Sequence, residues 1–125
     1  MRPNDASRRT AQYVDAYLCE SHRVDRAHGC PLAALASDLP NMPEVARARF
    51  TDGAERLVAG IAKLLRNLGL KDADALAWSA LAEMTGALVL SRAVSSARRA
   101  ARILQSSRAT VRARLGLAGT AGAGA

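Results

Sequence analysis

The sequence predicts an all-α protein of about five helices, and three observations support this fold class. Half of the residues are hydrophobic but only 3% are aromatic, so much of the apolar content is Ala and Leu, which favour helices over strands. Long segments repeat apolar residues at the i, i+3, i+4 spacing of an amphipathic helix. A chain of 125 residues suits one domain and is too short for two ordinary ones. Together these observations exclude an all-β sandwich or barrel.

The first predicted helix begins near Asn4, where short polar side chains can cap it, and runs to about His22. Tyr13, Tyr17 and Leu18 share one face of this helix, which we expect to be its packed side. The polar segment 23–29 is expected to be a loop.

A short second helix is predicted from Pro31 to Leu39, because proline is tolerated in a first helical turn. Pro40 and Pro43 should end it, since each removes a backbone donor and restricts the residue before it.

The clearest helical period follows, from about Pro43 to Leu68, with Gly69 as a natural residue after the helix end. Charged side chains occupy mostly the opposite side, so this helix should pack along one side only. Its apolar stripe consists of Phe50, Ala54, Leu57, Ile61, Leu64, Leu65 and Leu68.

The next predicted helix, from about Asp72 to Val94, differs because it is apolar on two faces. Asp72 is expected to cap its start. One face carries Ala77, Ala80, Leu81, Met84 and Leu88, and the other carries Ala75, Trp78, Ala82, Val89 and Ala93. A helix with two apolar faces must be covered twice, and in so small a domain the second cover is expected to be another subunit. The alternative is that the first helix covers this face within one chain.

The last predicted helix runs from about Ser96 to Leu115 and ends at Gly116. Its buried stripe is Ala100, Ile103, Leu104, Ser107, Val111 and Leu115. Arginines lie opposite, at Arg98, Arg99, Arg102, Arg108 and Arg112, with Arg114 nearer the edge of the stripe. Residues 1–115 are therefore expected to form the domain, and 116–125 a flexible Gly/Ala tail with nothing large to bury.

The sequence also bears on localisation. Its start has no apolar signal-peptide segment, and no run approaches the ~20 uninterrupted apolar residues of a membrane span. We therefore expect a cytoplasmic protein without membrane contact, in which Cys19 and Cys30 are free thiols.

Cys19, His22, His28 and Cys30 have the residue types of zinc ligands, but their spacing differs from that of structural zinc sites. Cys30 is better explained as a small buried apolar residue, so no metal and no cofactor is expected. The sequence contains no catalytic motif, and an enzyme is not expected.

Several segments, in their order along the chain, resemble the regulatory domain of TetR-type (TetR/AcrR) transcriptional repressors. They are Tyr17-Leu18, His22-Arg23, the string GCPLAALASDL (29–39), the helix from Phe50 to Leu68, the string GALVLSRAV (86–94), and the helix with Ile103-Leu104. The resemblance covers about residues 10–115.

The resemblance implies an all-α core whose last two helices pair with those of a second subunit as a four-helix bundle. It also implies a pocket for a small, usually apolar inducer among the preceding helices. The family's DNA-reading helix-turn-helix domain would precede this segment, and Met1 lies only about ten residues before the first match. The expectation is a ligand-sensing and dimerisation core, truncated or missing its DNA-binding domain, which reaches DNA only weakly or through an intact partner.

Ligand sites in helical domains lie between helices and are mostly apolar with a few polar anchors. The candidate ligand residues are Tyr13, Tyr17, Phe50, Leu57, Ile61, Trp78, Leu81, Glu83 and Met84, with Thr85 as a further anchor. Each apolar one could equally be ordinary core. For Glu83, pairing with an arginine of a neighbouring helix is favoured over ligand contact, because an unpaired carboxylate inside an apolar helix is costly.

The candidate homodimer residues are Ala82, Gly86, Val89, Ala93, Ala100, Leu104 and Val111. Gly86 is the most informative, since glycine inside a helix costs ~1 kcal/mol relative to alanine and usually has a packing reason.

The alternative function is a basic helical adaptor. The net charge of +7 and six arginines after Ser95, with no acidic residue there, suit binding to nucleic acid or an acidic protein. Because an arginine-rich run is more often a solvated face, this interpretation ranks second.

Overall fold

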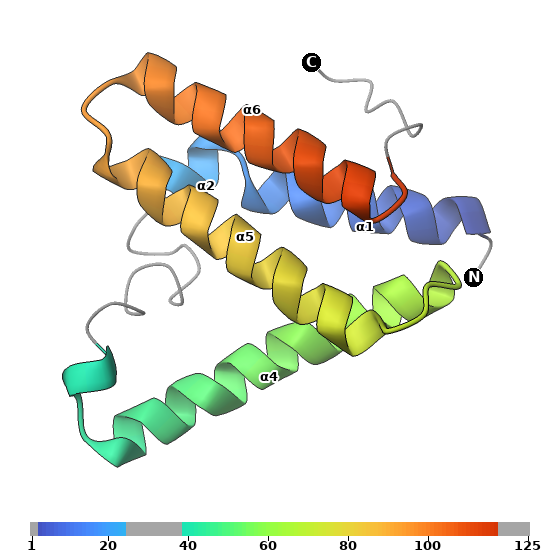
Figure 1. Cartoon of the computed structure of the whole chain (residues 1–125), viewed down its shortest axis with the longest axis horizontal. Coiled ribbons are helices and arrows are strands. Elements are labelled where there is room, and N and C mark those ends of the chain that lie inside the picture. The colour runs from blue at the N-terminus through green and yellow to red at the C-terminus, as the bar shows by residue number, and fades with distance from the viewer. Residues whose placement is uncertain (1–2, 25–38, 118–125) are drawn as a thin grey trace.

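The computed structural model describes residues 3–24 and 39–117, and these residues are almost entirely helical (Figure 1). The elements are α1 (Pro3–Tyr17), α2 (Glu20–Val24), the short 3₁₀ helix η1 (Leu39–Asn41), α4 (Glu44–Asn67), α5 (Ala73–Ala93) and α6 (Ala97–Arg114). No strand occurs among the described residues, and the predicted all-α fold class is confirmed.

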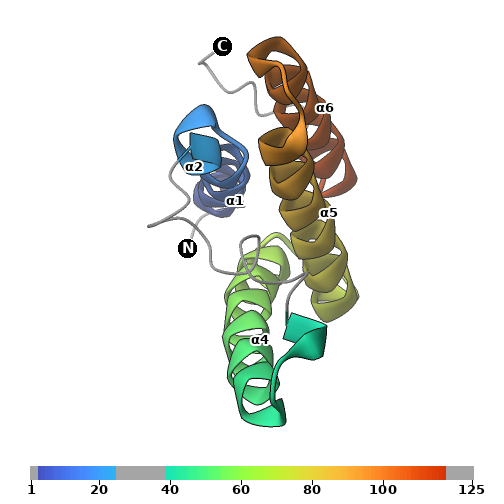
Figure 2. The ribbon, with the colours of Figure 1, turned by 90° about the vertical axis from the view of Figure 1, so that its left-hand side faces the viewer.

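The helices form two layers (Figures 1 and 2). A short connection after α5 turns the chain back, so α5 and α6 form an antiparallel hairpin with the most extensive helix contact in the described structure. On one side of this hairpin lie α1 and α4, and α4 packs mainly on α5. None of the described elements covers the other side of the hairpin (Figure 2).

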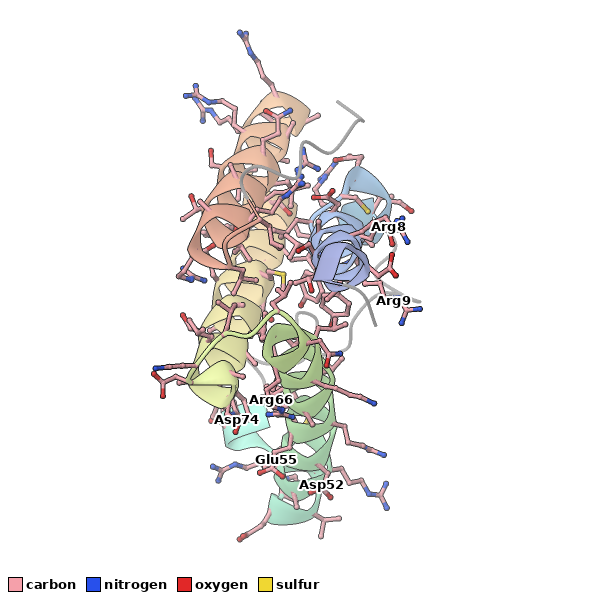
Figure 3. All side chains as sticks on the ribbon, turned by 90° about the vertical axis from the view of Figure 1, so that its right-hand side faces the viewer. Arg8, Arg9, Asp52, Glu55, Arg66 and Asp74 are labelled. Atoms are coloured by element: carbon pink, nitrogen blue, oxygen red, sulfur yellow. The ribbon has the colours of Figure 1, made fainter. Side chains whose placement is uncertain are left out.

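One contiguous core holds the two layers together. Its largest fully buried apolar side chains come from α1, α4, α5, α6 and the residues at their ends: Val14, Leu18, Leu65, Met84, Leu88, Val111 and Leu117. Charged side chains point the other way, as Arg8 and Arg9 do on α1 (Figure 3).

The first helix is shorter than predicted. It ends at Tyr17, and after a break at Leu18 and Cys19 the chain enters the separate helix α2. The His22 Nδ1 atom lies 2.7 Å from the Tyr17 carbonyl oxygen, and the two rings meet edge to face with centroids 4.7 Å apart. The His22 side chain thus forms a hydrogen bond with the carbonyl group that, in a continuous helix, would accept a backbone hydrogen bond. The prediction of one helix to His22 was wrong for this reason.

The predicted helix from Pro31 falls, up to residue 38, outside the described residues. At the next helix start, α4 begins at Glu44, directly after Pro43. The predicted stop at the two prolines is thus followed by the predicted long helix.

Two helices end in the same way, with the sequence Leu-Gly-Leu. After α4, Gly69 has φ +79° and the amide of Leu70 donates to the Leu65 carbonyl; after α6, Gly116 has φ +74° and Leu117 donates to Arg112. This is the Schellman motif, in which glycine takes the left-handed conformation and the following apolar residue packs back on the helix.

Leu117 is completely buried in consequence. The expectation that nothing large after Leu115 is buried was therefore wrong at this position. The rest of the tail, 118–125, lies outside the described residues.

The starts of the last two helices differ. Ser96 caps α6 by accepting a hydrogen bond from the Arg99 amide at 3.3 Å. Asp72 precedes α5, but its side chain makes no capping bond and its backbone is left-handed, with φ 57°. The expected Asp72 cap was wrong. The ion pair of Arg66 with Asp74, at 3.6 Å, joins the end of α4 to the first turn of α5 (Figure 3).

Candidate functional site on the two flanks of α5

Helix α5 carries two apolar surfaces, one buried within the chain and one exposed. Its inner flank faces α1 and α4 and consists of Ala77, Ala80, Leu81, Met84 and Leu88, all at most 4% exposed. Its outer flank consists of Trp78, Ala82, Gly86, Val89, Leu90 and Ala93, all exposed in the single chain. The two flanks are the candidate ligand and partner surfaces respectively.

Seven of the nine candidate ligand residues lie in the core or pack against it, and they come from α1, α4 and α5. The buried members are Tyr17, Ile61, Leu81 and Met84, and the partly buried ones packed against them are Tyr13, Phe50 and Leu57. We call these seven residues the inner junction. They come from three helices, as the helical spacing predicted, and they are also part of the core.

A polar contact links the inner junction to the neighbouring Thr85 of α5. The Tyr17 hydroxyl lies 3.0 Å from Thr85 Oγ1, which joins α1 to α5 through side chains 68 residues apart in the sequence. Because a hydroxyl can both donate and accept, this pair could also serve a polar group of a ligand.

Two candidate ligand residues lie elsewhere. Trp78 is 47% exposed on the outer flank, because it follows Ala77 by one position and a helix turns ~100° per residue. Glu83 faces α6, where its Oε1 pairs with Arg114 at 3.2 Å and its Oε2 accepts from Ser107 at 3.4 Å. The expectation that an arginine of a neighbouring helix pairs with Glu83 is confirmed, and neither residue belongs to the inner junction.

The candidate dimer residues also divide. Ala82, Gly86, Val89 and Ala93 are exposed on the outer flank. The other three are at most 4% exposed within the single chain: Ala100, Leu104 and Val111. These α6 residues face their own core, so the structure does not place them on an outward surface. The α6 residues that line an open surface beside α5 belong to the neighbouring stripe, which the sequence pattern alone did not reveal.

That stripe and α5 form an open groove of about 550 Å³, which we call the outer groove. It is lined by Ala82, Glu83, Gly86, Ala87, Leu90, Arg102, Ile103, Ser106, Ser107 and Thr110. At Gly86 a Cβ atom would meet nothing within 4 Å. Nothing in the described chain therefore requires glycine there, although the helix is weakened by it.

The arginines of α6 are not one solvated face. Arg112 pairs with Asp15 of α1 at 3.4 Å, Arg108 donates to the Leu18 carbonyl at 3.4 Å, and Arg114 pairs with Glu83. Three of the six thus bond to other parts of the chain. For Arg108 and Arg112 this is contrary to the expected opposite-face position, whereas Arg114 was expected nearer the edge of the buried stripe. Arg98, Arg99 and Arg102 are exposed.

Sequence reasoning also missed a clamp between α2 and the end of α5. Arg92 donates to the carbonyls of His22 and Arg23, at 2.8 and 3.0 Å, which lie in the last turn of α2. Arg23 in turn reaches the Ser91 carbonyl at 3.5 Å and forms an ion pair with Glu20. The hydrogen bond from Arg23 lowers the pKa of Glu20 below its ordinary value. Each arginine side chain thus bonds carbonyls at the end of the other helix.

Of the four residues with zinc-ligand chemistry, His28 and Cys30 lie outside the described residues. Cys19 is a free thiol whose Sγ donates to the Ala16 carbonyl at 3.0 Å. Within 3–24 and 39–117, no three His, Cys, Asp or Glu side chains cluster as a metal site would require.

Comparison with known proteins identifies the family of this helical domain. The family model described as transcriptional regulator LmrA/YxaF-like, C-terminal domain, matches residues 3–109. The chain belongs to this family of TetR-type regulator C-terminal domains. Searches of curated proteins and of solved structures gave no match.

Membership makes this TetR-type domain a ligand-binding and dimerisation domain of transcriptional regulators. It also gives a context for the apolarity of α5. This helix is long and apolar enough to cross a membrane by length and composition alone. In the fold its inner flank is instead buried against other helices.

Proposed function

We propose that this TetR-type domain forms a homodimer through the outer flank of α5 and the outer groove, and binds a small apolar ligand at the inner junction. A ligand that prefers one arrangement of α1, α4 and α5 shifts the hairpin that carries the partner surface. The domain acts in the cytoplasm, through a DNA-reading domain carried on the same polypeptide or on a partner.

One observation carries the dimer part of the proposal. Trp78, Val89 and Leu90 are 47%, 40% and 58% exposed on a single helix, beside a groove that Gly86 leaves open. Exposed apolar side chains gathered on one face indicate an interaction surface, whereas single ones do not. In a symmetric dimer this face pairs with itself, and a glycine allows the closest approach of two helices.

The test uses Gly86→Phe, with Gly86→Ala as its matched control. A Cβ atom at this position meets nothing within 4 Å in the single chain, and either replacement removes the helix cost of glycine, so we expect the monomer to stay folded. Sedimentation velocity should show a dimer for wild type and a monomer for Gly86→Phe, with Gly86→Ala weakened less. A dimer of wild-type strength in Gly86→Phe would exclude this face.

The ligand part has its own test. A panel of apolar compounds should contain members that raise the melting temperature of the wild-type dimer, because a ligand that binds only the folded state stabilises it. Leu57→Trp, which adds volume at the inner junction, should remove this shift while the protein remains dimeric. A shift that is unchanged in Leu57→Trp would place the ligand elsewhere.

The second candidate, a basic adaptor, is supported by three exposed arginines at the start of α6, namely Arg98, Arg99 and Arg102. Arginine at a helix N-terminus is unfavourable for the helix dipole, so a bound anion would relieve it. A DNA shift assay across a salt series separates the two functions. Binding that persists at physiological salt favours the adaptor, and its loss there favours the sensor domain.

A further inference from the structure

The outer groove is lined by one acidic and one basic side chain, which lie at different positions along the length of the α5–α6 hairpin. We call these two positions the acidic level and the basic level. Glu83 lines it from α5 and Arg102 lines it from α6. Glu83 has two donors, Arg114 at 3.2 Å and Ser107 at 3.4 Å, whereas a carboxylate can accept about four hydrogen bonds. Arg102 is exposed, and in the described part of the chain it has no ion pair. The groove therefore holds an incompletely used acceptor and a guanidinium available to a partner.

The levels of these groups follow from helix geometry. The bond from Ser107 to Glu83 fixes which residues of the antiparallel hairpin lie side by side. Arg102 precedes Ser107 by five residues, which places it ~7.5 Å from the Glu83 level, toward the end of α5. Gly86 follows Glu83 by three residues, ~4.5 Å in the same direction. Gly86 thus lies close to midway between the acidic and the basic level.

In a symmetric dimer whose two-fold axis is perpendicular to the length of the groove, each end of the groove in one copy faces the opposite end of the groove in the other copy. When the axis passes beside Gly86, the acidic level of one copy faces the basic level of the other, and each pair occurs twice. An axis placed at the level of Arg102 would instead bring the two Arg102 guanidinium groups together, and an axis at the level of Glu83 would leave each Arg102 without a carboxylate of the partner. The position that allows the closest helix approach is therefore also the position at which the charges are complementary.

We infer that the homodimer has one register, in which its two-fold axis passes beside Gly86 and Glu83 of each chain pairs with Arg102 of the partner subunit. This inference rests on the proposed dimer and specifies its partner as a second copy of this chain. The two intermolecular pairs fix the register and the orientation, while the apolar outer flank supplies buried area. Glu83 then bridges Arg114 of its own chain and Arg102 of the partner subunit.

Charge swapping tests the pairing. In Glu83→Arg both levels of the groove are basic, and in Arg102→Glu both are acidic, so each variant alone should self-associate at least about tenfold more weakly than wild type. Mixed in equal amounts, the two variants should form a heterodimer, because both of its pairs again join opposite charges. Light scattering of each variant and of the mixture gives the masses.

Lys63→Glu is the matched control for Arg102→Glu, because it makes the same change in net charge at an exposed position of α4. It should leave self-association within about twofold of wild type. Circular dichroism shows whether Glu83→Arg, which also loses its own Arg114 pair, remains folded. If Glu83→Arg does not fold, the comparison of Arg102→Glu with Lys63→Glu alone tests the pairing, because Arg102 is exposed and its replacement should not unfold the chain.

The outcomes distinguish a failure of the proposed register from a failure of the proposed dimer. A wild-type dimer whose charge variants associate as wild type does, or fail to recover on mixing, overturns this register and leaves the proposed function standing. A wild type that stays monomeric overturns the dimer and the register together.

Discussion

The two flanks of α5 have similar apolar character and opposite surroundings. On the inner flank Met84 and Leu88 are at most 1% exposed, whereas on the outer flank Val89 and Leu90 are 40% and 58% exposed. Helix α4 shows what a one-sided helix looks like, with its buried residues confined to one stripe. The difference teaches that the fold of the described residues buries one apolar face of α5 and leaves the other uncovered, and this uncovered face is the one proposed to bind a second copy.

The inner flank should set the stability of the single chain. Met84→Ala removes a side chain that is 1% exposed and leaves a cavity, so the free energy of unfolding should fall by about 2–5 kcal/mol. Chemical denaturation measures this loss. Met42→Ala makes the same change at a side chain that is 41% exposed and should cost less than about 0.5 kcal/mol. Equal losses at the two sites would remove the contrast between buried and exposed positions.

The outer flank should affect association instead. Leu90→Glu places a charge on the exposed face and should weaken the dimer by about 2 kcal/mol, roughly thirtyfold, without unfolding the monomer. Dilution followed by sedimentation equilibrium gives the dissociation constant. Val45→Glu, at a side chain 67% exposed on α4, should leave that constant unchanged. If the two variants behave alike, the outer flank is not the partner surface.

A smaller effect is expected at the polar contact of the inner junction. Tyr17→Phe removes the hydroxyl 3.0 Å from Thr85 and should cost about 1 kcal/mol of unfolding free energy. A double-mutant cycle with Thr85→Val isolates the interaction. Additive losses in the cycle would show that these two side chains do not interact in solution.

The smallest effect is a pH dependence at α2. Because Arg23 lowers the pKa of Glu20, this carboxylate favours the folded state above its ordinary pKa. That contribution should be lost as the pH falls through the lowered pKa. Glu20→Gln should therefore reduce stability slightly at pH 7 and not at pH 2. Thermal melting at both pH values measures it, and a larger effect at pH 2 would contradict the assigned sign.

The sequence predicted the fold well where periodicity decides. The bounds of α4, α5 and α6 are close to the predicted ones, because stripes of Leu and Ala, the prolines and the glycines at helix ends are local signals. The break after Tyr17 was missed because it depends on the His22 side chain bonding the Tyr17 carbonyl, and no helical pattern records that bond.

The candidate site was predictable only in part. Two apolar faces on α5 could be predicted, since they follow from spacing on one helix. Which stripe of α6 faces outward could not, because Ala100, Leu104 and Val111 are as apolar as a partner surface would be, and their burial depends on the packing of α6 in the whole chain. The burial of Leu117 had a local signal, the Leu-Gly-Leu ending that also follows α4.

Light scattering of the wild-type protein on a size-exclusion column, at micromolar concentration, is the most direct test of the central claim. We predict a mass about twice that of the 13.1 kDa chain, because a second copy is proposed to cover the outer flank of α5. A single species of 13.1 kDa at that concentration would contradict it.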